Sequence, residues 1–99
     1  MIKVMHKDFE TNEMVHVANV DTADLELAWK LTNNRHGSWS RGEFVNGVEN
    51  LDYSPLVEVV EPLVVKNGKT YGHRSSMVGD ELVTEGGSFK VAVFGFDKV

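Results

Sequence analysis

The sequence contains no cysteine. It therefore has no disulfide framework and no thiol chemistry, which fits a reducing compartment. Long apolar runs are missing too: from Met1 to Asp8 a polar or charged residue interrupts every apolar run within two positions. This start is no signal-peptide core, and no later stretch approaches the roughly 20 apolar residues of a membrane span. We expect a soluble cytoplasmic protein without a membrane partner.

Positive charge is scarce. Ten Lys and Arg stand against fifteen Asp and Glu, which gives a net charge of −5. Binding to a phosphate backbone needs concentrated positive charge, so nucleic acid is the less favoured class of partner. Residues 42–65 contain no Lys or Arg, and the acids in this stretch are Glu43, Glu49, Asp52, Glu58 and Glu61. The stretch is either a solvated strand face with a loop or an acidic patch that meets a basic partner.

Motifs that carry catalysis or bind cofactors are not found. Gly68-Lys69-Thr70 resembles the end of a phosphate-binding loop, but Leu63 stands where that motif needs its first glycine. The histidines lack the helical spacing and the cysteine partners of a metal site; they are His6, His16, His36 and His73. A serine nucleophile at Ser75 or Ser76 lacks the strand-to-helix turn that would present it. We predict no catalytic residue, no metal and no cofactor.

The first half of the chain predicts a hairpin and a helix. Alternating and Val-rich runs at 2–6 and 14–20 are typical of two antiparallel strands joined by a polar turn. Apolar residues then follow a helical period over 23–32, with Asp21 as the predicted cap and Trp29 on the buried stripe. Residues 35–53, rich in Gly, Ser and Asn, predict a long loop with at most one short turn.

The second half predicts more strands. Pro62 divides the apolar run 56–65 into two short pieces. Asn67-Gly68 is the strongest hairpin-turn pattern in the chain, because both residues accept the positive φ of a type I′ turn. A Gly86-Gly87 turn leads into the run 89–96, which is apolar on both alternating sets and predicts a strand covered on both faces.

Length and element order together predict the fold class. The 99 residues form one small domain, residues 1–99. We expect an α+β fold in which one helix packs on a twisted antiparallel sheet of about five or six strands, either open or curled into a partly open barrel.

Two surfaces are candidates for binding. The loop around Trp39 combines an aromatic side chain with basic and small residues, and Trp and Arg are frequent in protein–protein hot spots. The predicted partner-binding residues there are Arg35, His36, Trp39 and Arg41. In the alternative interpretation Trp39 folds back and fills the core. A second alternative is a nucleic-acid surface on the acid-free segment 66–74, formed by Lys66, Lys69, Tyr71 and Arg74.

The tail resembles a known family pattern. An Arg-Ser-x-Ser-Val-(Gly or Ser)-Asp turn, a strand, a glycine turn and a strand ending in Gly-Phe are matched at Arg74, Ser75, Val78, Gly79, Asp80, Gly87, Phe89, Val91, Gly95 and Phe96. Met77 occupies the position of the second serine, and the helix residues Leu27-Ala28-Trp29 are compatible with the part before the turn. In these residues the chain resembles the YodL-like domain and related small accessory proteins of bacteriophages and mobile elements.

This resemblance implies a small protein of viral or mobile-element origin that acts in the cytoplasm of a host cell. Members of the group are associated with anti-restriction or host takeover and have no agreed catalytic residues. The expected function is therefore non-enzymatic: binding of a host or phage protein.

Overall fold

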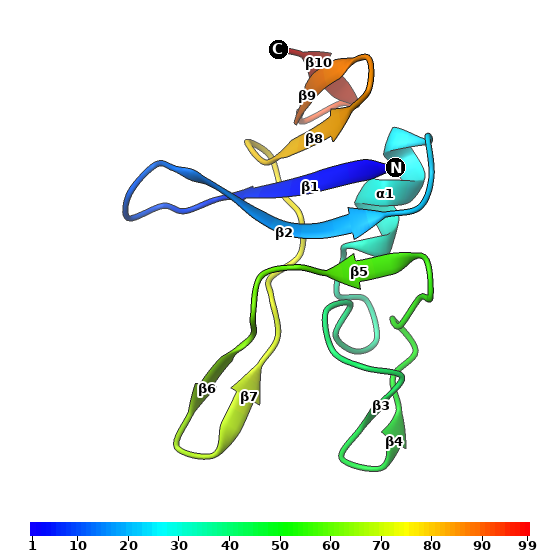
Figure 1. Cartoon of the computed structure of the whole chain (residues 1–99), viewed down its shortest axis with the longest axis vertical. Coiled ribbons are helices and arrows are strands. Elements are labelled where there is room, and N and C mark those ends of the chain that lie inside the picture. The colour runs from blue at the N-terminus through cyan, green and yellow to red at the C-terminus, as the bar shows by residue number, and fades with distance from the viewer.

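The computed structural model describes residues 1–99 and has the expected α+β architecture. One helix and a six-stranded antiparallel sheet, in the order β10-β9-β8-β1-β2-β5, form the body of the molecule (Figure 1). Two further two-stranded sheets, β3-β4 and β6-β7, lie outside it. Strands β10 and β5 end the large sheet as separate edges, so the sheet does not close into a barrel.

The elements follow the chain in the predicted order except for β3 and β4, which lie in the segment predicted as a loop, and for the last strand, which is divided in two. Their bounds are β1 (Ile2–Lys7), β2 (Met14–Val20), α1 (Leu25–Leu31), β3 (Phe44–Val45), β4 (Val48–Glu49), β5 (Val57–Val59), β6 (Val64–Lys66), β7 (Lys69–Tyr71), β8 (Glu81–Thr84), β9 (Gly87–Val91) and β10 (Phe96–Lys98). The seven-residue α1 is the only helix, and it has neither the length nor the apolar run that crossing a membrane requires.

The first hairpin is confirmed and supplies much of the core. Strand β1 lies between β2 and β8, and its alternate residues Ile2, Val4 and His6 are buried on one face. The register with β2 shifts between Val4 and Met5. This bulge buries two consecutive β2 residues, Val17 and Ala18, where strict alternation would expose one of them.

Helix α1 contacts β1 and β8, and its N-terminus differs from the prediction in one detail. Asp24, not Asp21, is the N-cap: its carboxylate accepts the N–H groups of Glu26 and Leu27. Asp24 directly precedes the first helical residue, so its short side chain reaches the first-turn donors, which Asp21 lies too far back to serve. Ala28 is fully buried, whereas Trp29 is only partly buried against the core.

The predicted last strand, 89–96, is wrong as a single element. The chain turns after β9, with Ala92 donating to the Gly95 carbonyl at 3.0 Å and Gly95 at φ +71°, and returns as β10. Strand β10 pairs only with β9 at the edge of the sheet, and within the segment Val91 is buried in the core and Phe96 packs against the core. Val93 and Phe94, at the turn, are 76 % and 92 % exposed.

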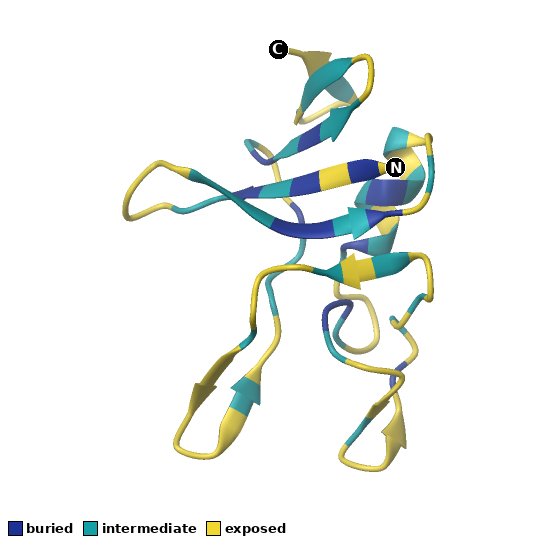
Figure 2. Cartoon of the chain, viewed as in Figure 1, coloured by how far each residue is buried: buried dark blue, intermediate teal, exposed yellow.

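Two hairpins project from the body at the end opposite to β10 (Figure 1). The β6–β7 arm, residues 64–71, confirms the Asn67-Gly68 turn, whose φ values are +52° and +74°. The β3–β4 arm, residues 44–49, turns at Asn46-Gly47 inside the segment predicted as a loop. Figure 2 shows both arms largely exposed, in contrast to the buried strands of the body.

Candidate functional site

The tail turn, residues 74–80, is organised around the fully buried carboxylate of Asp80. Its Oδ1 accepts the Lys7 N–H at 2.8 Å, and its Oδ2 accepts the Met77 N–H at 2.8 Å. Gly79, at φ +97°, provides the left-handed step before it. Asp80 thus ties the tail turn to the end of β1, as expected for a carboxylate that accepts backbone donors in the turn.

Arg74 is the charged partner of Asp80, and we call Arg74, Asp80 and the backbone N–H groups of Lys7 and Met77 together the Asp80 clasp. Its guanidinium donates to both oxygens of Asp80, at 2.7 and 2.8 Å, and also to the carbonyls of Ser75 and Lys7 at 3.0 and 3.1 Å. The ring of Phe9 lies 5.2 Å from the guanidinium carbon. A bidentate pair of this kind is strong and directional. Four of its five N–H donors bond inside the chain, and its side chain is 33 % exposed, so the structure sets Arg74 apart from the exposed nucleic-acid surface predicted for segment 66–74.

A second chain of hydrogen bonds connects β1, α1 and the tail turn. His6 Nε2 lies 2.9 Å from the Ser76 hydroxyl, which lies 2.7 Å from the Thr32 hydroxyl. Thr32 donates its proton to the Ala28 carbonyl at 2.9 Å. While Thr32 keeps this bond, Ser76 donates to Thr32 and His6 Nε2 donates to Ser76, since each hydroxyl has a single proton. This arrangement places the proton of His6 on Nε2.

This assignment excludes a serine nucleophile of the triad type. His6, Ser76 and Asp80 do meet, but Asp80 Oδ2 approaches the same nitrogen, Nε2, at 3.8 Å. A triad places the acid on the opposite ring nitrogen and leaves Nε2 as the acceptor that activates the serine. Here Nε2 is the donor. Ser76 is also only 3 % exposed, so the cluster holds the fold together.

The ionisation of the cluster follows from burial and pairing. Burial raises the pKa of Asp80, but the Arg74 guanidinium and the N–H groups of Lys7 and Met77 outweigh it and hold the pKa below its ordinary value of 3.8. Burial lowers the pKa of His6 from 6.5 to about 4, against the opposing effect of Asp80. At neutral pH the cluster thus contains a charged Arg74–Asp80 pair and a neutral His6.

Trp39 is 1 % exposed and forms part of the core. Its indole N–H donates to the Arg74 carbonyl at 2.8 Å, and its ring lies between those of His6 and His73, with centroids 6.0 and 5.8 Å away. The hypothesis of Trp39 as an exposed anchor is wrong. The alternative is confirmed, since the ring fills the space under the sheet beside the tail turn.

The rest of the predicted partner-binding loop is held by its backbone. One oxygen of Asp52 accepts the N–H groups of Arg35, His36 and Gly37 at 2.6, 3.0 and 2.8 Å. Burial raises the pKa of Asp52, but these three donors hold it below 3.8. The side chains of Arg35 and His36 are exposed and that of Arg41 is half-buried, so the structure separates them from the buried Trp39.

The remaining candidate residues, both the basic ones of segment 66–74 and the acidic ones of stretch 42–65, lie on different elements of the fold. Lys66, Lys69 and Tyr71 lie together and exposed on the β6–β7 arm, with the Lys69 ammonium 5.3 Å from the Tyr71 ring centroid. The acids of the stretch 42–65 do not form one patch: Glu43 and Glu49 lie at the β3–β4 arm, Asp52 binds loop backbone, Glu58 lies on β5 and Glu61 follows it. No group of three His, Asp or Glu side chains is placed to hold a metal ion.

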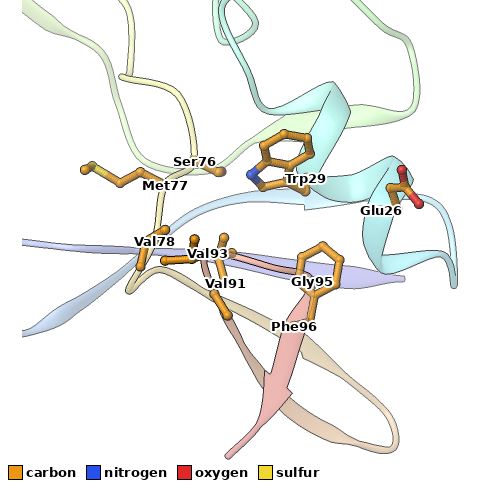
Figure 3. Close-up of a pocket in the computed structure, with 10 residues that line it drawn as sticks. Glu26, Trp29, Ser76, Met77, Val78, Val91, Val93, Gly95 and Phe96 are labelled. Carbon is orange, nitrogen blue, oxygen red and sulfur yellow. The ribbon is translucent and has the colours of Figure 1, made fainter.

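An apolar groove of about 540 Å³ lies between α1, the tail turn and the last hairpin. Figure 3 shows Trp29 of α1 on one side of it and Val91 and Phe96 of the last hairpin on the other. Ten residues line it, namely Glu26, Trp29, Ser76, Met77, Val78, Val91, Ala92, Val93, Gly95 and Phe96. Sequence reasoning missed this groove because residues 89–96 read as one covered strand. Gly95 inside that run was the available sign of a turn.

No family model, no curated protein and no solved structure matches the chain. The resemblance of the tail to the YodL-like domain therefore stays a prediction, and the residues that carry it form the Asp80 clasp and the last hairpin.

Proposed function

We propose that this protein is a non-enzymatic, phage-type accessory protein that binds a host or phage protein through the apolar groove. The observation that carries the proposal is the exposed lip of the groove. Three residues of the lining are exposed: Val93 at 76 %, and Met77 and Val78 on the tail turn at 44 % and 53 %. Large apolar side chains that gather around a hollow mark a site of interaction.

The groove also indicates the chemistry of its occupant. Trp29 and Phe96 offer aromatic surface, and aromatic side chains are enriched in interface hot spots. Glu26 is the only titratable residue in the lining, and the whole chain carries a net charge of −5. We infer a partner segment that inserts apolar side chains and places a Lys or Arg beside Glu26.

Binding without catalysis fits the surroundings of the groove. Ser76, at its floor, already uses its hydroxyl proton on Thr32, and His6 behind it is a neutral donor. Neither residue is arranged to activate a nucleophile. The resemblance of the tail adds the expected setting, which is host takeover or anti-restriction in the cytoplasm of a host cell.

Paired pull-downs test the proposal. Immobilised wild type and Val93→Ser are exposed to the same bacterial lysate, and Val60→Ser serves as the matched control because Val60 is another exposed valine, outside the groove and both arms. We expect a protein captured by wild type and by Val60→Ser but lost with Val93→Ser, with unchanged melting temperatures. Equal capture by all three would remove the groove as the binding site.

Nucleic-acid binding is the alternative, carried by the exposed Lys66, Lys69 and Tyr71. Without Arg74 this surface has little charge, so we expect weak and strongly salt-dependent binding. Sub-micromolar affinity for any DNA or RNA at about 150 mM salt would overturn the protein-partner proposal, since non-specific binding under such conditions lies at roughly 1–100 µM.

A further inference from the structure

We propose that the two arms are a self-association surface, on which a second copy of this chain docks reciprocally. The β3–β4 arm of one copy would meet the β6–β7 arm of the other, and the same contact would occur twice. This inference is independent of the groove, because no residue of either arm lines the groove.

Both arms expose apolar residues that the chain itself does not cover. Phe44 and Val48 on the β3–β4 arm are 64 % and 69 % exposed, and Val64, Val65 and Tyr71 on the β6–β7 arm are 52 %, 64 % and 48 % exposed. Each arm pairs only with itself, in strands of two or three residues. An isolated two-stranded hairpin is marginally stable in water, so a covering partner would stabilise both arms.

The pairing registers show which residues share a face on the β6–β7 arm. Val64 is opposite Tyr71, and Lys66 is opposite Lys69. Because side chains alternate along a strand, these two pairs lie on one face, with apolar side chains at the base of the arm and two ammonium groups near its tip. Like charges directly opposite each other destabilise a hairpin unless a counter-charge approaches.

The β3–β4 arm carries the complement of this face. Phe44 is opposite Glu49, which gives an apolar side chain beside a carboxylate. Glu43 precedes the arm, and no Lys or Arg occurs in residues 42–65. Neither these two acids nor Lys66 and Lys69 form an ion pair within the chain, whose salt bridges involve only His6, Arg74 and Asp80.

The opposite charges of the two arms and their exposed apolar residues therefore favour a second copy as the occupant. Every copy supplies one acidic and one basic arm, each with an exposed aromatic residue, so a two-fold arrangement satisfies both arms of both copies and closes. Within one copy the arms stand apart (Figure 1) and cannot satisfy each other in this conformation. Both grooves would remain free in the dimer.

Charge reversal tests this pairing by sedimentation velocity and light scattering. Glu43→Lys/Glu49→Lys makes both arms basic, and Lys66→Glu/Lys69→Glu makes both acidic. We expect wild type to dimerise with an affinity that falls as salt rises, and each variant alone to associate about 30-fold more weakly or worse. Mixed together, the two variants should form one-to-one heterodimers, because every arm again meets an opposite charge.

A matched control separates local from global charge. Glu10→Lys/Glu13→Lys changes the net charge as much as the first variant does, but at exposed residues between β1 and β2, and should dimerise like wild type. A wild type that is monomeric up to about 1 mM, or a mixture that fails to associate, would overturn the proposal. So would a monomer whose Lys66 and Lys69 prove to be needed for binding an oligonucleotide.

Discussion

The tail turn and the β6–β7 arm are close in the sequence and opposite in construction. In the tail turn, residues 74–80, the carboxylate of Asp80 is fully buried and its partners all come from within the chain. In the arm, apolar and charged side chains are exposed, and Lys66 faces Lys69 without a counter-ion. Buried polar groups that are hydrogen-bonded within the chain hold the fold in one arrangement. Exposed apolar side chains and unpaired charges remain available to bind a partner. The following experiments test this division, starting with the largest expected effect.

Asp80→Ala should lower the free energy of unfolding by about 3–5 kcal/mol, because it leaves Arg74 without its counter-charge and two backbone N–H groups without acceptors. The structure thus raises the cost above the roughly 1–2 kcal/mol expected for an ordinary turn carboxylate. Urea unfolding measures it, and Asp97→Ala, at an exposed aspartate of β10, is the control. An Asp80→Ala protein as stable as wild type but defective in binding would make Asp80 part of a functional site.

Trp39→Ala should cost about 3 kcal/mol, toward the lower end for a buried aromatic residue because the surrounding loop can relax into the cavity. Trp39→Phe should cost less, since one six-membered aromatic ring remains and only the five-membered ring with its donor to the Arg74 carbonyl is lost. Equilibrium unfolding of the two variants measures both costs. A Trp39→Ala protein of wild-type stability would restore the hypothesis of an exposed anchor.

Acid should destabilise the protein in two steps. Stability rises with pH wherever the unfolded chain binds more protons. Between pH 6.5 and about 4 the unfolded chain protonates His6 and the folded chain does not, so the free energy of unfolding should fall by about 3 kcal/mol as pH decreases through this range. The stabilisation from Asp80 is complete above pH 3.8 and is lost below it, as pH falls through the lowered folded-state pKa.

Chemical denaturation at a series of pH values checks the first step. His6→Gln retains a donor toward Ser76 but does not titrate, so it should flatten the slope between pH 6.5 and about 4 while leaving the loss at lower pH. An unchanged slope in that variant would assign the titration to another group.

The smallest effect is expected on the arms. Val48→Ser, at a residue that is 69 % exposed, should change stability by no more than about 0.5 kcal/mol. The same substitution at Val4, which is 0 % exposed, should cost at least about 2 kcal/mol because it leaves a cavity and buries a hydroxyl. Thermal melts of this pair compare arm and body directly. Equal losses would show that the arm contributes to the stability of the body.

Local patterns predicted the elements whose causes are local. The alternation of β1 and β2, the period of α1 and the Asn67-Gly68 turn depend on neighbouring residues, and the structure confirms all three. The run 89–96 misled for a related reason: apolar residues on both alternating sets are typical of a covered strand, and the same composition also suits an exposed turn beside a groove.

The sequence by itself determined the class of this protein: an α+β fold with an acidic net charge, no cysteine and a hairpin at each end. Only the tertiary structure decided the roles of Trp39, Arg74 and Asp80. Asp80 is 73 positions from Lys7, and Trp39 is 35 positions from Arg74, yet these pairs are joined by hydrogen bonds. The spacing of apolar residues along the chain indicates which secondary structure each local segment forms. Whether a distant pair becomes a buried clasp or stays exposed depends on which surfaces the folded chain brings together.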